Sequence, residues 1–364
     1  MKTDRLASLD VLRGFDMLFI MGGDALVCAV AALFGSPDFA QRFGHVPWHG
    51  LQFMDTVFPL FLFLAGVSFP FSATKSRLRG LTDGRIALKA LRRGLTLVAL
   101  GLVCGGLLKL QFATLRVWSV LGRIGIAWML AAWIFLLFKL RVRLVIALGI
   151  LTAVTAFTVF VPAPGSAAGV DPFSPDGNFG CWLDRTLTAG HTYKPLFDPE
   201  GFSGLLPAVV TAMLGMFAGE LVCRDNRSVC GKKAAELLAC GVFCALAGGA
   251  LSMVFPINKA LWSPSFVLVV GGYSFSLFAL FYWIVDVLGF RRWAFFFTVI
   301  GVNSITIYMA QRIVNFRIVR DFFFNGFAEL FPPMFGNVVK CAGYVAVCWL
   351  FLLFLHKKDV HLKV

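Results

Sequence analysis

Charged side chains are scarce in this sequence of 364 residues. They make up 14% of it, whereas soluble domains carry roughly 25%, and apolar residues reach 59% with a mean hydropathy of +0.82. This composition excludes an ordinary soluble globular chain. It predicts an all-α, polytopic integral membrane protein, because a helix satisfies its own backbone hydrogen bonds inside lipid.

Several chemical signatures are also missing. The nine cysteines include no CxxC pair, only Cys181 is expected outside the helices and cytoplasmic loops, and no histidine-rich ligand spacing occurs. Neither a disulfide framework nor a metal site is therefore predicted. No glycine-rich phosphate loop and no internal repeat of the two halves is present either.

Apolar segments of about 20 residues, the length that spans the hydrocarbon of a bilayer, recur about ten times. The predicted spans cover residues 11–34, 50–73, 94–110, 118–138, 144–161, 202–222, 235–255, 264–288, 293–311 and 337–355. We expect them to form a single transmembrane domain over residues 1–364, with a long outer loop at 162–201.

Basic residues outnumber acidic ones, and the formal net charge is +14. Such an excess can indicate a nucleic-acid partner, but its distribution favours membrane topology instead. With a cytoplasmic N-terminus, about two thirds of the lysines and arginines fall in cytoplasmic segments, as the positive-inside rule requires. Both termini are then cytoplasmic, and no nucleic acid is expected. The first span is interpreted as a retained helix, because Asp10, Arg13, Asp16 and Asp24 interrupt its apolar run.

Titratable groups gather where the second span begins. His45 and His49 flank a tryptophan in HVPWHG, and Asp55 follows a turn or two below them. Ionisable groups at membrane depth are costly and are therefore functional candidates, although an interfacial histidine can also be a hydrogen-bonded anchor. Pro47 favours a non-helical approach to the span.

Further polar residues fall toward the same outer face. Arg123 needs an anionic partner there, and Asp24 and Asp55 are the predicted ones. Long ordered loops tend to be functional, so the loop 162–201 is interpreted as a lid or a substrate-binding loop. Small and polar residues such as those of GVNSITIY can alternatively pack helices together. The convergent set is Asp24, His45, His49, Asp55, Arg123, Glu200, Asn258 and Asn303.

The cytoplasmic segment 73–93 holds seven basic residues and one acidic residue. Topology or attraction to anionic lipid heads explains this charge without any site. A functional alternative is an electrostatic funnel for a polyanionic cofactor.

Six motifs in this order carry a resemblance to a known family. They are RLASLDVLRG, HVPWHGLQFMDTVFPLFLFLAG, VLGRIGIAW, FDPEG, INKALWSPSF and GVNSITIYMAQ. Together they span nearly the whole chain, which resembles the catalytic membrane part of heparan-alpha-glucosaminide N-acetyltransferase and its bacterial relatives. On this resemblance we expect the chain to be like the bacterial members, which do not have the large luminal domain that precedes the first helix of the lysosomal member.

The resemblance implies transfer of the acetyl group of cytoplasmic acetyl-CoA to the amine of a terminal glucosamine, or related amino sugar, on the periplasmic side of a bacterial inner membrane. It also implies a homodimer, and acetyl-CoA is the co-substrate, with no metal. The family's active-site histidine lies three residues before the motif's tryptophan, which is His45 here. An asparagine of the family's first helix falls on Asp24. The next motif position, usually asparagine, is His49, and catalysis is not transferred to it.

Imidazole titrates near neutral pH and can remove the proton of a sugar amine. His45 can equally carry the acetyl group itself, and Asp24 or Asp55 would orient it. The expected catalytic residues are thus His45, Asp24 and Asp55. Expected substrate-binding residues are Trp48, His49, Arg123, Glu200, Asn258, Asn303 and Ser304. Expected acetyl-CoA contacts are Arg5, Arg13, Arg92 and Arg93.

Two other functions stay open on the residues alone. An O-acyltransferase acting on envelope polysaccharide would use the same groups. Ten helices and buried charges also describe a proton-coupled sugar transporter, although the missing repeat argues against it.

Overall fold

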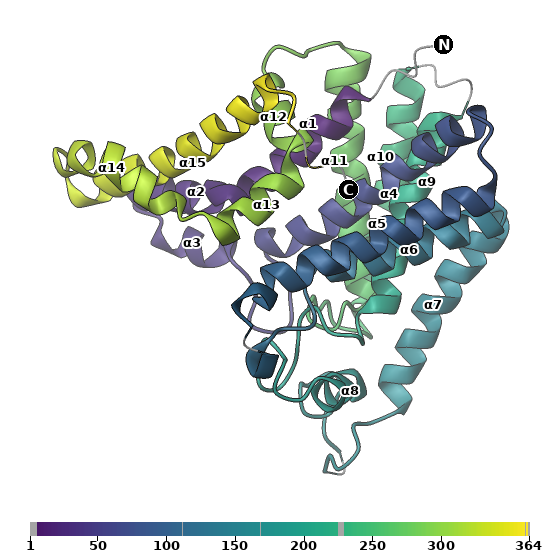
Figure 1. Cartoon of the computed structure of the whole chain (residues 1–364). Coiled ribbons are helices and arrows are strands. Elements are labelled where there is room, and N and C mark those ends of the chain that lie inside the picture. Colours follow the sequence, from purple (N-terminus) through teal and green to yellow (C-terminus); the bar gives the residue numbers. More distant parts are fainter. Residues whose placement is uncertain (1–5, 111, 168, 225–228, 361, 363–364) are drawn as a thin grey trace. The chain divides into compact units, whose positions relative to one another are not determined.

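A computed structural model describes residues 6–110, 112–167, 169–224, 229–360 and 362. Helices provide nearly all of the regular structure of this part of the chain (Figure 1), and an isolated bridge joins Pro162 to Asn178. The predicted all-α class is confirmed.

The helices follow one another along the chain, with π-helical turns at Phe19–Gly23 and Tyr282–Val287. The α-helices are α1 (Ala7–Leu18), α2 (Asp24–Leu33), α3 (Pro37–Phe43), α4 (Phe53–Leu78), α5 (Asp83–Cys104), α6 (Val120–Leu137), α7 (Leu140–Phe160), α8 (Phe179–Leu187), α9 (Leu205–Cys223), α10 (Gly231–Leu251), α11 (Pro264–Phe281), α12 (Phe295–Val302), α13 (Ser304–Ile313), α14 (Phe316–Glu329) and α15 (Pro333–Lys357).

Among the described residues, eight helical stretches are long and apolar enough to cross a membrane, where the sequence predicted about ten. They are Ala7–Leu33, Phe53–Leu78, Val120–Leu137, Leu140–Phe160, Leu205–Cys223, Gly231–Leu251, Pro264–Val287 and Pro333–Lys357.

The other two expected spans are helical but differ from the prediction. Helix α5 begins eleven residues earlier than the apolar run at 94–110, so Lys89, Arg92 and Arg93 lie within it and interrupt its apolar length. The expected span 293–311 is divided at Asn303 into α12 and α13, which have 8 and 10 residues. Each half is shorter than the ~20 residues that a membrane requires.

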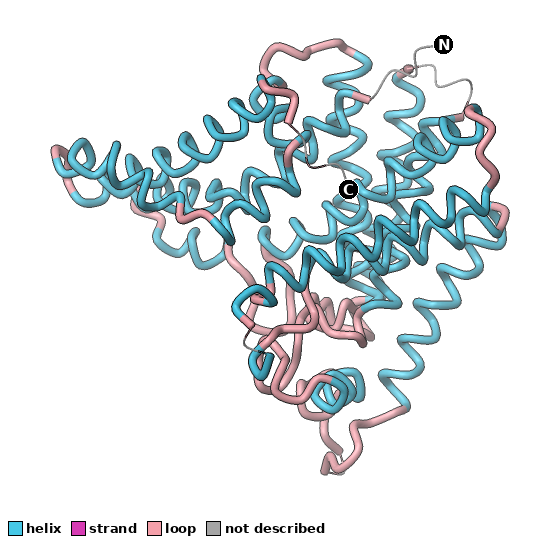
Figure 2. Tube along the Cα trace, viewed as in Figure 1, coloured by secondary structure: helices cyan, strands magenta, loops and turns pink. Residues whose placement is uncertain are grey.

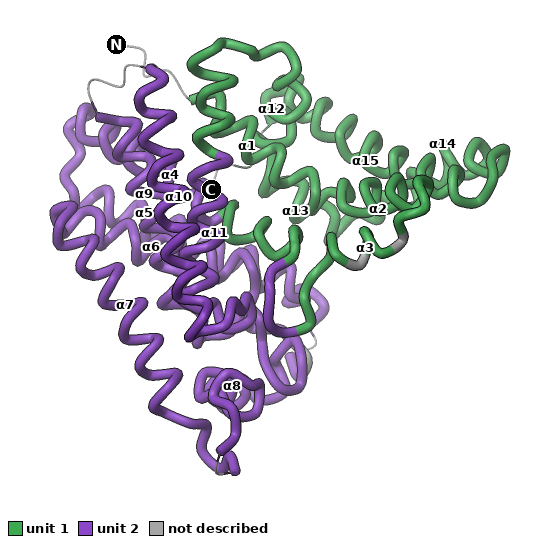
Figure 3. Tube along the Cα trace, turned by 180° about the vertical axis from the view of Figure 1, so that it is seen from behind, with its two compact units in different colours: residues 1–47, 52–61, 278–363 green, residues 48–51, 62–277, 364 purple. Residues whose placement is uncertain are grey.

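The chain divides into two compact units (Figure 3). Unit 1 comprises residues 1–47, 52–61 and 278–363, and unit 2 comprises residues 48–51 and 62–277. Helix α4 is continuous from Phe53 to Leu78 and contributes to both units. A single domain over residues 1–364 remains a prediction.

Unit 1 is built on a close contact between α1 and α12. A Cβ at Gly14 would lie 1.8 Å from the carbonyl oxygen of Phe297, and one at Gly301 would lie 1.9 Å from that of Asp10. Small residues allow helix backbones to approach in this way inside membranes. Between α1 and α2, Gly22 has a φ of 109°, a conformation that favours glycine. The buried side chains of Met17, Met21, Val299, Ile300, Ile307, Phe316, Val345, Cys348 and Leu352 form the core of this unit.

Unit 2 depends on a similar glycine contact between α4 and α9. Added Cβ atoms at Gly66, Gly215 and Gly219 would lie 2.0 to 2.3 Å from backbone carbonyl oxygens of the facing helix. Helix α5 packs along α6, and α6 and α7 both pack on α9. The backbones of α4 and α9 are therefore in close contact at three positions along the two helices.

The longest loops of unit 2 gather at one end of its helices (Figure 2). The Gly50 N–H donates to the carbonyl of Ile257, the Trp48 Nε1–H donates to that of Phe173, and the rings of Phe173 and Phe255 are 4.7 Å apart. These contacts join residues 48–51 to the loop 162–201 and to the turn between α10 and α11. The arginines and lysines that begin α5, α7 and α10 lie at the opposite helix ends.

Candidate functional site

Asp55 occupies the third position of α4 in unit 1, and its side chain is 1% exposed. Its Oδ2 accepts the backbone N–H of Gln52 at 3.1 Å and that of Val46 at 3.3 Å. The bond from Gln52, the residue before the helix, is half of a capping box. A negative charge is also favourable at a helix N-terminus, so the local sequence fixes the position of the Asp55 side chain and favours a carboxylate there.

The other carboxylate oxygen of Asp55 contacts His45. The distance from His45 Nδ1 to Asp55 Oδ1 is 2.7 Å. Since a carboxylate can only accept, His45 must donate its Nδ1–H, and the neutral ring then carries its lone pair on Nε2. Residues 44–52 form no helix, as Pro47 predicted.

The two members of this pair differ in exposure. The His45 side chain is 57% exposed while the Asp55 side chain is buried. A buried carboxylate that orients an open imidazole is the arrangement of a general base or a nucleophile. Of the two carboxylates expected to orient His45, Asp55 is the one that contacts it.

In unit 2, Trp48 and His49 lie against the loop cluster. The Trp48 ring is 4.7 Å from that of Phe197 in an edge-on contact, and its centroid is 5.8 Å from that of His49. Gly50, whose φ of 112° favours glycine, turns the chain back after His49. The imidazole of His49 is exposed, and its Nδ1 lies 3.2 Å from Nδ2 of the fully buried Asn258. Trp48, His49 and Asn258 were predicted as separate candidates from the sequence, and the structure brings them together.

Burial lowers the pKa of His49, which precedes the α4 span. Asp171 of the long loop acts in the opposite direction and only partly offsets this effect. His49 is therefore a neutral imidazole near pH 7.

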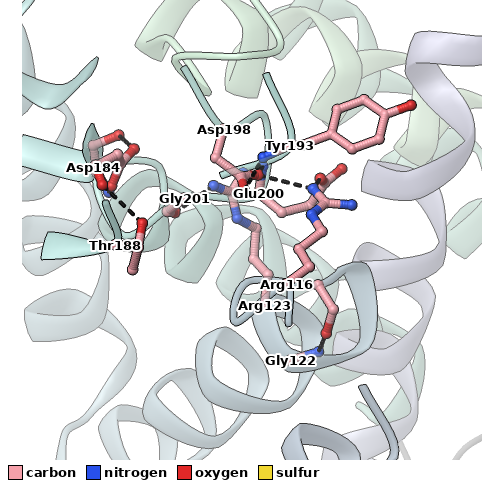
Figure 4. A network of polar contacts seen from close by, with 11 residues as sticks. Arg116, Gly122, Arg123, Asp184, Thr188, Tyr193, Asp198, Glu200 and Gly201 are labelled. Atoms are coloured by element: carbon pink, nitrogen blue, oxygen red, sulfur yellow. Dashed lines mark hydrogen bonds and ion pairs between the residues drawn. The ribbon is translucent and has the colours of Figure 1, made fainter. Parts of the chain in front are cut away.

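A network of charges closes the long loop of unit 2 (Figure 4). Arg116 pairs with Asp198 at 2.8 Å and with Glu200, and its guanidinium lies 4.5 Å from the centre of the Tyr193 ring. Burial acts to lower the pKa of Arg116, but the hydrogen bond to Asp198 and the charge of Glu200 raise it above its usual value. The partner of Glu200 is thus Arg116.

Arg123 lies beside this network and is 1% exposed. The sequence predicted Asp24 or Asp55 as its partner, whereas the structure shows Nη2 donating to the carbonyl of Gly201 at 2.6 Å (Figure 4). Its guanidinium also lies 5.0 Å from the centre of the Trp262 ring. A cation over an aromatic face is stabilised, and the charges of Glu200, Asp184 and Asp198 also act on Arg123. Arg123 therefore supports the long loop through Gly201.

Trp262 itself is fully buried and has a φ of 52°, in the left-handed region that a bulky residue rarely adopts. Its Nε1–H donates to Thr211 Oγ1 at 3.0 Å, which ties the WSPS turn to α9. Such strain costs on the order of 1 kcal/mol and persists only where the surroundings enforce it.

Asp184 and Cys181 of α8 are structural. Asp184 accepts the N–H and the Oγ–H of Ser203 at 3.1 and 2.7 Å, while burial raises its pKa. Burial, aided by Asp184, raises the pKa of the Cys181 thiol to about 12. Cys181 therefore remains a thiol rather than a thiolate nucleophile.

Three further expected site residues also belong to unit 1. Asp24 begins α2 half-buried, and its electrostatic neighbours are the thiols of Cys28 and Cys341. Asn303 is buried at the break between α12 and α13, where its Nδ2 donates to Val299 O at 3.3 Å. Ser304 begins α13 and is 7% exposed. Their catalytic or binding roles remain predictions.

The arginines expected to contact acetyl-CoA have different surroundings. Arg13 lies 3.6 Å from Asp10 on α1, Arg92 is exposed on α5, and Arg93 lies 4.5 Å from the Trp128 ring centre. Arg5 lies outside the described residues. Within the part of the chain that is described, no group of three or more His, Cys, Asp and Glu side chains could hold a metal ion.

Sequence reasoning missed Arg116, Asp184, Asp198 and Trp262. Arg116 lies just before VLGRIGIAW and Asp198 lies inside FDPEG, so both were within or beside quoted motifs. One of these motifs has a basic residue beside it and the other contains an acidic residue. This opposite charge is the signal from which an ion pair between them could have been predicted.

Comparisons with known proteins agree on one family. A family model described as Heparan-alpha-glucosaminide N-acetyltransferase, catalytic, matches residues 5–255 of this chain. A Homo sapiens protein named heparan-alpha-glucosaminide N-acetyltransferase is 27% identical over 367 residues, which cover 85% of this chain and 53% of that protein. The Mus musculus protein of the same name is 27% identical over 373 residues, which cover 86% and 54% respectively. This chain spans about half the length of these relatives.

Proposed function

Because the chain belongs to the heparan-alpha-glucosaminide N-acetyltransferase catalytic family, we propose that it transfers the acetyl group of acetyl-CoA to the amine of a terminal glucosamine or related amino sugar. The observation that carries this proposal is the His45–Asp55 pair at the start of α4. It supplies an oriented, accessible imidazole, which can act as the base or the nucleophile when an amide forms from a thioester.

The chemistry follows from the state of His45. An ammonium has no lone pair, so the sugar amine must lose a proton before or during its attack on the thioester carbonyl. With Nδ1–H held by Asp55, Nε2 of His45 can take that proton. The C–N bond forms, the C–S bond breaks, and the coenzyme A thiolate leaves and is protonated. The ionised Asp55 stabilises the imidazolium formed on the way.

His45 can instead attack the thioester with Nε2 and carry the acetyl group to the amine. This route suits a donor and an acceptor that arrive from opposite sides of a membrane. Both routes need the same ring orientation, so both depend on Asp55.

We propose that acetyl-CoA is used from the cytoplasmic side and the amino sugar from the periplasmic side of a bacterial inner membrane. The distribution of basic residues supports this orientation, since the starts of α5, α7 and α10 are basic and positive charge favours the cytoplasm. The exposed, basic Arg92 suits an anionic donor, as do Arg13 and Arg93. A homodimer is a further proposal, which the mass of the purified protein–detergent complex tests.

The proposal is tested by incubating purified protein with radiolabelled acetyl-CoA and a panel of amino sugars. Mass spectrometry of the product should show an amide on the sugar nitrogen. An ester would instead support an O-acyltransferase acting on envelope polysaccharide. Uptake of labelled sugar into proteoliposomes without acetyl-CoA, and without any acetylated product, would contradict the proposal and support a transporter.

A further inference from the structure

The hydrogen bond between Asn258 and His49 has only one possible direction. Asn258 Oδ1 accepts the backbone N–H of Leu261 at 2.9 Å, which assigns that atom as the oxygen of the amide. The atom that faces His49 Nδ1 at 3.2 Å is therefore the NH₂ group, which can only donate. Asn258 is fully buried, and its backbone N–H donates to Ser263 Oγ at 3.0 Å. The side-chain amide therefore cannot easily flip.

It follows that His49 Nδ1 must carry the lone pair. Its ring is then neutral with the proton on Nε2, because an imidazolium would place a second N–H against the amide donor. Two other histidines have the opposite arrangement. His45 Nδ1 faces a carboxylate, and His191 Nδ1 lies 2.8 Å from the carbonyl oxygen of Leu115, which can only accept.

The ring of His49 is held in place but open to solvent. Trp48 is anchored by its bond to Phe173 and its contact with Phe197, and Gly50 is anchored to Ile257. With Nδ1 occupied by Asn258, the exposed imidazole can present only its Nε2–H to a ligand. The half-buried indole next to it offers an apolar face of the kind on which the C–H groups of a pyranose can pack.

We propose that His49 is a positioning residue for the acceptor, whose Nε2–H donates a hydrogen bond to a hydroxyl or ring oxygen of the amino sugar while Trp48 packs on the pyranose. This assignment rests on the proposed function and names its acceptor subsite. Neutrality matters here, because an amino sugar arrives largely as an ammonium ion and a charged imidazole would repel it. Asn258 prevents that charge by turning its donor toward Nδ1.

The tautomer is tested directly by ¹⁵N NMR of protein labelled at histidine. At pH 7 we expect a neutral ring protonated at Nε2, assigned to His49 by its loss in His49→Asn. The His191 signal is the internal reference and should be of the Nδ1–H type. Asn258→Asp keeps an acceptor for Leu261 but replaces the donor with a carboxylate, so it should move the His49 proton to Nδ1. A wild-type His49 that is charged, or protonated at Nδ1, overturns the proposal.

Kinetics test the role. Loss of one hydrogen bond to a neutral group should raise the KM for glucosamine roughly tenfold in His49→Ala. The KM for acetyl-CoA should not change, and kcat should fall much less than the KM rises. His49→Asn restores a side-chain N–H donor and should recover part of the affinity. His191→Asn is the matched control and should behave as wild type. An unchanged KM for glucosamine in His49→Ala, or an equal loss in kcat alone, rules out the positioning role.

These experiments distinguish failure of the proposed function from failure of the His49 subsite. If wild-type protein acetylates no amino sugar, the proposed function fails, whereas the NMR result still reports the tautomer of His49. If the amino sugar is acetylated and the His49 variants bind it normally, only the subsite assignment fails.

Discussion

At the scale of single residues, the proposed chemistry depends on which nitrogen of each imidazole carries the proton. Three donors surround the Asp55 side chain, and Asp55 in turn holds His45 with its lone pair on Nε2. The closeness of His45 and Asp55 could be predicted from the sequence, because Asp55 follows the histidine by only ten residues and was expected slightly deeper at the start of the same span. The choice between Asp24 and Asp55 could not, because it depends on the π-helical turn at Phe19–Gly23, which sets the direction of α2.

Asp55→Asn should reverse the tautomer of His45. The amide oxygen would replace Oδ2 and accept the two backbone N–H groups of Val46 and Gln52, which turns the NH₂ group toward His45 Nδ1. The proton of His45 then moves to Nε2. Nε2 loses the lone pair that it needs to act as a base or a nucleophile. We expect kcat to fall by about 10²- to 10⁴-fold with a small change in the KM for either substrate. A variant that keeps wild-type kcat would show that Asp55 only caps the helix.

At the scale of elements, the sequence predicted most helices but not where polar residues divide or extend them. Helix α5 starts among basic residues because Thr82 accepts the N–H of Arg85 and begins the helix before the apolar run. The chain breaks at Asn303, where an apolar sequence predicted one span. The links of Arg116 to Asp198 and Glu200 were also out of reach, because no periodicity connects a short loop to a partner some eighty residues away.

The contact between α4 and α9 gives a stability prediction. A Cβ at Gly215 would lie 2.0 Å from the backbone oxygen of Phe63, so Gly215→Ala must force the two helices apart. We expect a lower melting temperature in detergent, by several degrees, because a destabilisation of about 1 to 3 kcal/mol is typical of overpacking.

Gly249→Ala on α10 is the matched control for this substitution. No atom lies within 4 Å of the added methyl group, and alanine is the better helix former by roughly 1 kcal/mol. Its melting temperature should stay the same or rise slightly. If Gly215→Ala melts no lower than Gly249→Ala, the close approach of α4 to α9 is not important for stability.

At the scale of the whole molecule, we expect the two substrates to reach the protein from opposite sides of the membrane. In unit 2 the long loops lie at one end of the helices and the basic starts of α5, α7 and α10 lie at the other, so the two ends of this unit differ chemically. Proteoliposomes of one orientation should form N-acetylglucosamine only when acetyl-CoA is on the side of the basic residues and glucosamine on the other. Orientation can be verified by protease cleavage of the long loop 162–201. Equal product with both substrates on the loop side would contradict transfer across the membrane, while leaving acetyl transfer itself intact.

The claim on which everything else depends is that His45 and Asp55 act as one catalytic unit, and a double-mutant cycle measures it most directly. Acetyl transfer to glucosamine would be compared in wild type, His45→Ala, Asp55→Asn and the double variant, each shown to be folded by its thermal unfolding. We predict that His45→Ala loses about 10³-fold or more in kcat and that adding Asp55→Asn costs nothing further, because residues that act together are strongly non-additive. Full activity in His45→Ala, or losses that multiply in the double variant, would contradict the account.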